Sequence, residues 1–234
     1  TRLENAYPRS EFIKSLDPLF RPVDMATAPD GTMYIVDMYR GVVEWAPGAR
    51  TGTYLRQKID QYQMDKVRTN GRVWRVTYDG IPRDRTPPRM LDESAATLLN
   101  HLDHPNGWWR DTAQQLLVLK QDRSVVPALR RMAAGSPNIL ARVHALWTLE
   151  GLGALDPPFV RSAMRDPNPR IRRQAIRASE TLYKAGDRSF ANDYRALAAD
   201  PDPDVAIQAL LTIHALGAGD VTAIATDAAG RNPA

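Results

Sequence analysis

The sequence contains no cysteine, no long apolar run and no block of charge of one sign. Without cysteine the chain has no disulfide, no thiolate zinc site and no Cys-x-x-Cys-His attachment for haem. None of its apolar runs approaches the ~20 residues that a membrane-spanning helix requires. Because a chain without cysteine suits any cellular compartment, this absence limits the covalent chemistry and leaves the location open.

Charge is balanced along the chain. Residues 1–80 contain 12 Lys and Arg against 10 Asp and Glu, and the remainder contains 19 against 17. Nucleic-acid binding requires basic side chains that are concentrated on one face or along one helix. We therefore expect no nucleic-acid partner, although the net charge is +4.

The composition changes along the chain. The first residues, TRLENAYPRSEF, lack Met and the basic-then-apolar layout of a signal peptide, so we expect the chain to start inside a longer precursor. After Arg85 the sequence becomes helical and repetitive. The sequence therefore predicts a mixed, mainly α chain in three parts, which are residues 1–80, a linker over 81–97 and a helical part over 98–234.

The helical part contains four repeats. They begin at His104, Ser136, Asp166 and Asp200, and they align on Ala113, Ala145, Ala175 and Ala209 at spacings of 32, 30 and 34 residues. Spacings of this size are typical of α-solenoids. A proline-containing turn opens each repeat, and proline is well suited to the first position of a helix. We therefore expect helices to start at Pro105, Pro137, Pro169 and Pro203.

The order of residue types within a repeat is also regular. Arginine stands three positions before the aligned alanine in three repeats, as Arg110, Arg142 and Arg172, whereas the fourth repeat has Ala206. A small alanine lets paired helices approach, and apolar residues at helical spacing fill the core between repeats. The predicted core residues are Leu116, Leu117, Leu146, Leu149, Ile176, Leu210 and Ile213.

The companion helices of these repeats are visible over residues 125–135, 157–166 and 190–200. An Asp-Pro turn followed by Arg and then Ala resembles the pattern of the HEAT family. The resemblance implies an α-solenoid of about four HEAT-like repeats. Such solenoids offer extended binding surfaces and usually do no chemistry themselves.

Histidines in the helical part have two interpretations. His101 and His104 are three residues apart, as metal ligands on one helix face are, but Pro105 places His104 in a turn and no third ligand accompanies them. We therefore expect no metal site. His144 and His214 lie in helix interiors, where structural histidines are common.

Three tryptophans also have two interpretations. Trp108, Trp109 and Trp147 suit a peptide-binding ladder on the solenoid. They equally suit a packing cap between the solenoid and the part that precedes it, and we favour the cap because tryptophan is mostly buried.

Strand signals are confined to the first 80 residues. Residues 22–28 and 32–39 are strand-forming, and Pro29-Asp30-Gly31 between them has the composition of a tight turn. Residues 71–78 alternate between apolar and polar, which predicts a third strand. A helical insertion is expected near 46–70. Because a lone two-stranded ribbon is marginal in water, these strands should belong to something larger.

The order of these features looks like one β-propeller blade. The motifs are Phe-Arg-Pro-Val-Asp from Phe20, Pro-Asp-Gly-x-x-Tyr-x-x-Asp-Met-Tyr-Arg-Gly from Pro29, Tyr-Leu-Arg from Tyr54 and Gly-Arg-x-x-Arg-Val from Gly71. Over residues 11–78 they resemble the last blade of the quinoprotein-type glucose/sorbosone dehydrogenase-like propellers. The closest resemblance is to a bacterial subfamily often labelled membrane-bound dehydrogenase, in which HEAT-like repeats follow the propeller.

The resemblance implies a periplasmic protein with a six-bladed propeller that oxidises a sugar or an alcohol. It implies pyrroloquinoline quinone and calcium as cofactors of the full-length protein, and haem c on a cytochrome module or partner outside this chain. The chain contains one or two blades at most, and the family's catalytic histidine lies upstream, so we expect no catalytic residue here. The implied partners are the remaining blades, from the same precursor or another chain, and a cytochrome c module or subunit.

The candidate cofactor-binding residues lie at strand ends. Asp37 and Arg40 end the second strand, where propeller loops often line the channel mouth, and a quinone with three carboxylates favours a bidentate arginine. Arg21 and Asp24, at the start of the first strand, are the second choice. In the alternative that we favour, Asp37 and Arg40 pair with each other or with the insertion and stabilise the blade.

Two functions follow for the chain. In the first, it is the C-terminal portion or a subunit of a quinoprotein-like dehydrogenase, and its solenoid docks a cytochrome or a partner subunit. In the second, it is a non-catalytic interaction scaffold without redox chemistry. A propeller that binds carbohydrate or protein is a third form of the same fold, and fold alone does not choose among them.

Overall fold

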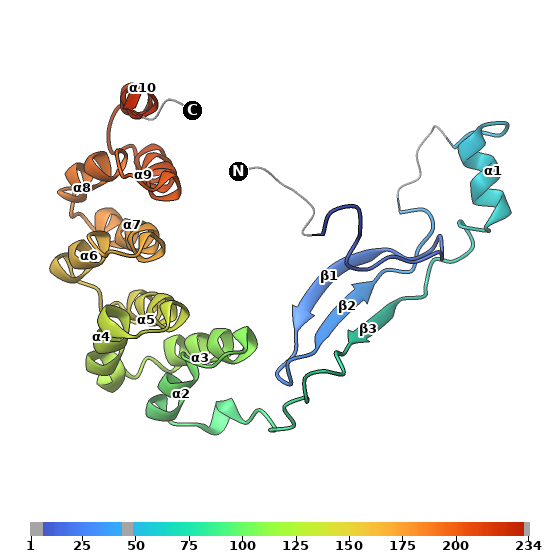
Figure 1. The fold of residues 1–234 in the computed structure, drawn as a ribbon, viewed down its shortest axis with the longest axis horizontal. Coiled ribbons are helices and arrows are strands. Elements are labelled where there is room, and N and C mark those ends of the chain that lie inside the picture. Colours follow the sequence, from blue (N-terminus) through green and yellow to red (C-terminus); the bar gives the residue numbers. More distant parts are fainter. Residues whose placement is uncertain (1–6, 44–48, 232–234) are drawn as a thin grey trace. The chain divides into compact units, whose positions relative to one another are not determined.

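The computed structural model describes residues 7–43 and 49–231 (Figure 1). The chain divides into two compact units, Thr1–Thr86 and Pro87–Ala234. The predicted insertion at 46–70 begins within residues 44–48, which lie outside the described residues.

The first unit contains a three-stranded antiparallel sheet with the strand order β1-β2-β3. Its strands, which lie where strands were predicted, are β1 (Pro22–Thr27), β2 (Met33–Asp37) and β3 (Arg72–Val76). In the central strand, Ile35 pairs with Met25 on one side and Trp74 on the other. The pairing shifts between Pro22 and Asp24, which is a bulge in the edge strand. A typical propeller blade has four strands, so the propeller stays a prediction.

The turn between β1 and β2 has the predicted chemistry. The N–H of Gly31 donates to the carbonyl of Ala28 (3.0 Å), and the N–H of Ala28 donates to the carbonyl of Thr32 (2.8 Å). Gly31 has a φ of 81°, which a side chain would strain, and the Asp30 carboxylate accepts from the Thr32 hydroxyl (2.7 Å). The Pro-Asp-Gly turn therefore fixes the register of the hairpin, as three-residue loops with a final glycine do.

The insertion between β2 and β3 contains the predicted helix, α1 (Tyr54–Gln61). Thr53 caps its N-terminus by accepting from the N–H of Arg56, and Ile59 is its one buried side chain. On the exposed side, the Arg56 guanidinium donates to the carboxylates of Asp60 (2.5 Å) and Asp65 (3.1 Å). The last contact holds the segment after the helix against it.

The second unit is a row of paired helices, as Figure 1 shows. The helices are α2 (Ala95–His101), α3 (Gly107–Lys120), α4 (Val126–Gly135), α5 (Ile139–Gly151), α6 (Pro157–Met164), α7 (Pro169–Lys184), α8 (Phe190–Leu197), α9 (Pro203–Leu216) and α10 (Val221–Arg231), with 3₁₀ turns η1 (Met90–Asp92) and η2 (Arg123–Val125). Helices α4, α6 and α8 pack on α5, α7 and α9 respectively, and α3, α5, α7 and α9 contact one another in sequence. This is the predicted solenoid arrangement.

Each repeat begins with a capped helix, and the cap corrects one prediction. The caps are Asn106, Asn138, Asn168 and Asp202, whose side chains accept from the N–H two residues ahead. Pro169 and Pro203 are the first helical residues, as predicted. Pro105 and Pro137 do not start helices, because each precedes a capping asparagine in extended conformation.

Apolar side chains of the solenoid form two clusters, one from η1 to α5 together with Ala178 of α7, and one from α6 to α9. Six of the predicted core residues are buried, and Leu210 is half-buried. Trp109 is buried in the first cluster, and Trp108 packs against it. None of the described helices is long and apolar enough to span a membrane.

Candidate functional site

The end of strand β2 is organised around the carboxylate of Asp37, which is fully buried. It accepts hydrogen bonds from the N–H groups of Arg21 (2.8 Å) and Tyr39 (2.8 Å) and from the Trp74 indole (3.1 Å). Burial raises the pKa of this carboxyl, but these donors and the charge of Arg72 outweigh it, so the pKa of Asp37 lies below its ordinary value. Asp37 therefore ties the chain just before β1 and just after β2 to the Trp74 side chain of β3, and its negative charge would repel a cofactor carboxylate.

Two residues after Asp37, the chain is held in an uncommon conformation. Tyr39 has a φ of 46°, in the left-handed region that side chains rarely adopt. The Arg72 guanidinium lies 3.3 Å from the centre of the Tyr39 ring and 5.5 Å from that of Trp74. The stacked arginine and the Asp37 hydrogen bond hold Tyr39 in place, and the left-handed residue turns the chain so that Arg40 leaves the sheet.

Arg40 lies in a cavity of about 180 Å³, away from Asp37. The cavity is lined by Arg40, Val42, Val43, Met64, Asp65 and Arg68, so it lies between the end of β2 and the segment after α1. The Nε of Arg40 is buried and has no hydrogen-bond partner among the described residues. A buried guanidinium nitrogen that lacks a partner among the described residues is costly unless another group supplies one.

The second pair of candidates does not join this site. The Arg21 guanidinium donates to the carbonyl of Phe20 (2.9 Å). Asp24 is exposed, accepts from the N–H of Met25 (2.8 Å), and pairs in register with Val36, so it lies on the face opposite Asp37. The structure thus brings Arg21 to Asp37 through its backbone N–H and leaves Asp24 and Arg40 apart from both.

These residues do not form a site for a whole quinone. The cavity beside Arg40 is smaller than the roughly 300–1,000 Å³ of typical cofactor pockets, and the Asp37 carboxylate is already occupied. Among residues 7–43 and 49–231, no group of three or more His, Asp or Glu side chains is placed to hold a metal ion such as calcium. At most, Arg40 offers one cation to one carboxylate.

The sequence analysis missed the residues that surround the Asp37 carboxylate. Arg72, Trp74 and Tyr39 hold the Asp37 anchor together, yet Arg72 and Trp74 lie in β3, more than 30 residues along the chain. The alternation over residues 71–78 predicts the strand, and strand pairing brings Trp74 beside Ile35. Only the register of that pairing identifies the indole as the partner of Asp37.

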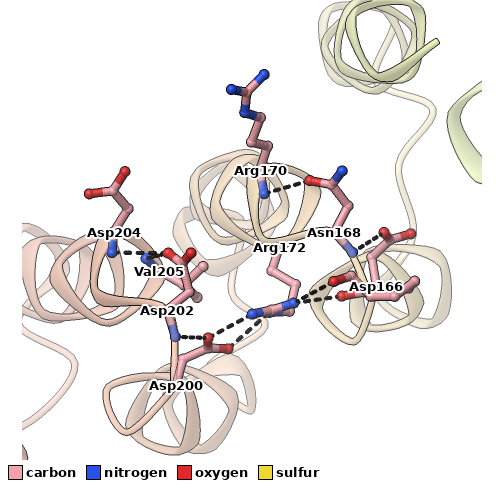
Figure 2. A network of polar contacts seen from close by, with 9 residues as sticks. Asp166, Asn168, Arg170, Arg172, Asp200, Asp202, Asp204 and Val205 are labelled. Carbon is pink, nitrogen blue, oxygen red and sulfur yellow. Dashed lines mark hydrogen bonds and ion pairs between the residues drawn. The ribbon is translucent and has the colours of Figure 1, made fainter.

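In the solenoid, the polar side chains form contacts between repeats (Figure 2). Arg172 binds Asp200 of the next repeat through two hydrogen bonds, from Nε (2.9 Å) and from a terminal nitrogen (2.7 Å). Its other terminal nitrogen donates to the carbonyl of Asp166 (2.9 Å). The Arg172 and Asp200 side chains are 14% and 6% exposed, and the hydrogen bond to Asp200 raises the pKa of Arg172. Each such pair fastens two consecutive repeats.

The arginine–aspartate contact between repeats recurs at Arg142 and is missing at Arg110. Arg142 pairs with Asp166 and also donates from Nε to the carbonyl of Ala133 (2.8 Å). Arg110 donates to its own turn, and its buried Nε has no hydrogen-bond partner among the described residues. The residue aligned with the acceptors Asp166 and Asp200 is Ser136. We name Arg110, Arg142, Arg172, Asp166 and Asp200 the Arg–Asp ladder.

The paired histidines are parts of the fold. His101 contacts the Glu93 carboxylate (2.8 Å), and His104 accepts from the N–H of Asn106 (3.0 Å). Both rings lie about 5 Å from the Trp109 ring. These contacts account for both histidines through hydrogen bonding and packing at the start of the solenoid.

The remaining candidates lie along the helix row. His144 is half-buried, which lowers its pKa, and contacts Gln114 of the previous repeat (2.8 Å). Trp147 donates to Gln174 of the next repeat (2.8 Å). His214 is exposed, so the predicted structural role is wrong for this residue. These polar contacts link neighbouring repeats along the row.

Two family comparisons cover different parts of the chain. The paired, stacked helices define the second unit as an α-solenoid. Residues 95–178 match the family model of HEAT repeats, so this solenoid contains HEAT-like repeats, as predicted. Residues 1–80 match a domain of unknown function, DUF7133. No curated protein matches the chain.

Proposed function

We propose that this chain joins a β-sheet domain to a partner-binding solenoid and performs no chemical step by itself. The observation that carries the proposal is the exposure of the sheet. Every residue of β1 is exposed, and the apolar side chains Met25 and Val73 are 64% and 67% exposed. Exposed apolar strands with unpaired edges associate with further β-structure. We infer that additional strands, such as the remaining blades of a propeller, cover this sheet in the functional protein.

The test compares the two units as separate polypeptides. Residues 1–86 alone should show weak, non-cooperative thermal unfolding by circular dichroism and rapid proteolysis. Residues 87–234, the matched control, should unfold cooperatively because they keep both apolar clusters. A cooperative, protease-resistant fold of residues 1–86 would contradict the proposal.

The solenoid has the partner-binding role in this proposal. HEAT-like repeats present extended surfaces that usually bind proteins. The proposed partner is a cytochrome c module or another subunit, in the periplasm. The proposed partner and the proposed location both rest on the resemblance of residues 11–78 to quinoprotein propellers.

A second candidate is a quinoprotein-like dehydrogenase that oxidises a sugar or an alcohol, and the state of Arg40 favours it. Bound pyrroloquinoline quinone would supply the oxidising chemistry. Arg40, whose Nε has no hydrogen-bond partner among the described residues, would meet one of its carboxylates. The other groups of the cofactor site would come from blades outside this chain.

The experiment for this candidate is a quinone titration of a protein that contains the complete sheet domain, with calcium present. Arg40→Ala should weaken quinone affinity, and a dye-linked assay should detect oxidation of an aldose or an alcohol. Absence of quinone binding would reject the dehydrogenase. Quinone binding that is unchanged in Arg40→Ala would remove Arg40 from the cofactor site.

A further inference from the structure

The cavity beside Arg40 is built by a close approach of two backbone segments. If residue 41 had a side chain, its Cβ would lie 2.7 Å from the Cα and 2.7 Å from the carbonyl oxygen of Met64. These distances are too short, so only glycine fits there. This approach places Arg40 on one wall and Arg68 on another. Both arginines therefore line one partly open space, which the close approach at Gly41 creates.

The charges in this cavity leave a cationic excess. Arg40 has no counter-charge among the described residues, and its Nε is buried. Arg68 donates from Nε to the carbonyl of Asp65 (2.8 Å), which does not neutralise its charge. The Asp65 carboxylate is already paired with Arg56 (3.1 Å). Among the described lining residues, two cations therefore stand beside one carboxylate, and that carboxylate is paired with Arg56.

The rest of the lining is apolar. Val42, Val43 and Met64 form the walls between the two arginines. A cavity of about 150 Å³ is sufficient for benzene, and this cavity has about 180 Å³. Its size and lining suit a small molecule with an apolar body and one anionic end.

We propose that this cavity binds a small organic monocarboxylate. The carboxylate would be held by the guanidinium groups of Arg40 and Arg68, and the apolar body by the valines and Met64. A single negative charge matches the site better than a doubly charged phosphate, because Asp65 lies in the same wall. The proposal does not depend on quinone binding, since the whole quinone is too large for the cavity.

Benzoate is the probe, because its ring and carboxylate match the two parts of the lining. It is titrated into a ¹⁵N-labelled protein that contains the complete sheet domain, and the amide chemical shifts of this chain's residues are followed. We expect saturable shifts confined to residues 40–43 and 64–68, with a dissociation constant on the order of a millimolar for so small a ligand. Sodium chloride and phosphate at matched ionic strength should leave these shifts small.

Variants separate the site from general charge effects. Arg40→Gln should weaken benzoate binding by about tenfold to a hundredfold, since it removes hydrogen bonds to a charged group. Arg68→Gln, at an exposed position, tests the same pair without a buried change. Lys66→Gln is the control, because it removes an equal charge nearby from a side chain that does not line the cavity.

Three results would overturn the proposal. These are the absence of saturable shifts, an equal response to chloride, and an equal loss of affinity in Lys66→Gln. Because the probe is benzoate and the measurement is the amide shifts around the cavity, a failure of this titration is distinct from a failure of the same protein to bind quinone. Saturable benzoate binding that both arginine variants weaken and Lys66→Gln preserves would support the site.

Discussion

The two units of the chain bury very different amounts of apolar surface. Among the described residues of the first unit, the buried apolar side chains are Leu19, Ala28, Ile35 and Ile59, whereas the solenoid contains two continuous clusters. The sheet is held by its backbone ladders and by the hydrogen bonds that converge on Asp37. Because apolar burial is the dominant stabilising term in folding, the solenoid should be the more stable unit. The sheet should be vulnerable to the loss of one carboxylate.

Removal of that carboxylate should have the largest effect. Asp37→Ala leaves the N–H groups of Arg21 and Tyr39 and the Trp74 indole without their acceptor, at a cost of about 3–5 kcal/mol to the sheet. Hydrogen exchange should become fast in β1, β2 and β3 and stay unchanged in the solenoid. Asp24→Ala, an exposed aspartate of the same sheet, is the control and should have little effect. Unchanged exchange in β2 of Asp37→Ala would refute the anchoring role.

Within the solenoid, the largest effect is expected at the Arg–Asp ladder. Arg172→Met leaves Asp200 buried without its partner and should lower the free energy of unfolding by about 3 kcal/mol. Arg173→Met, the next residue on α7, breaks a solvent-exposed pair with Asp204 and should cost about 1 kcal/mol or less. Urea unfolding followed by circular dichroism measures both. Equal losses would show that the buried pair has no special role.

Low pH should destabilise the sheet more than the solenoid, by a smaller amount than the removal of the Asp37 carboxylate. The pKa of Asp37 is lowered in the folded protein, so the folded state binds fewer protons than the unfolded state near that pKa. This contribution is present above the ordinary aspartate pKa of about 4 and is lost as pH falls through the lower folded value. Amide signals of β2 in urea titrations between about pH 5 and about pH 2 should report it. Asp37→Asn should flatten this pH dependence, and an undiminished dependence would assign it to other groups.

The smallest effect is expected where the ladder is incomplete. Ser136→Asp would place a carboxylate at the position that Asp166 and Asp200 occupy in later repeats, near the unpartnered Nε of Arg110. Ser136 already accepts from the N–H of Asn138 (3.2 Å), a turn bond that aspartate preserves. We expect a gain of about 1 kcal/mol in thermal unfolding. Ser136→Asn is the control without the charge, and an equal gain there would exclude ion pairing as the cause.

Local chemistry made much of the fold predictable. The Pro29-Asp30-Gly31 turn, the helix at Tyr54 and the repeats on Ala113 follow from residues that are neighbours in the sequence. The missing acceptor at Ser136 is also visible in the aligned repeats. The capping role of Asn106 and its equivalents was missed, although asparagine is a strong capping residue. The sequence contains this capping signal, but the prediction placed the helix starts at the prolines.

The candidate site depends on contacts that the sequence does not reveal. Asp37 and Arg40 stand three residues apart. The Asp37 carboxylate accepts a hydrogen bond from Trp74 on another strand, whereas Arg40 lines a cavity that the close approach of Gly41 and Met64 creates. Spacing suggested that the two act together, and the left-handed Tyr39 between them separates their directions. Long-range pairing therefore decided the roles that local pattern left open.

The Arg–Asp ladder also gives the solenoid a direction and a rule for changing its length. The third repeat receives Arg142 through Asp166 and offers Arg172 to Asp200, whereas the second repeat has Ser136 and only offers Arg142 onward. Either repeat can therefore be excised and still leave an acceptor for the arginine that precedes it. Loss of residues 166–199 would join Arg142 to Asp200, and loss of residues 136–165 would bring Asp166 to the unmatched Arg110. The fourth repeat has Ala206 at the arginine position and therefore offers no arginine to a following repeat. An array built in this way can shrink or grow by duplication in its middle while its two ends stay distinct.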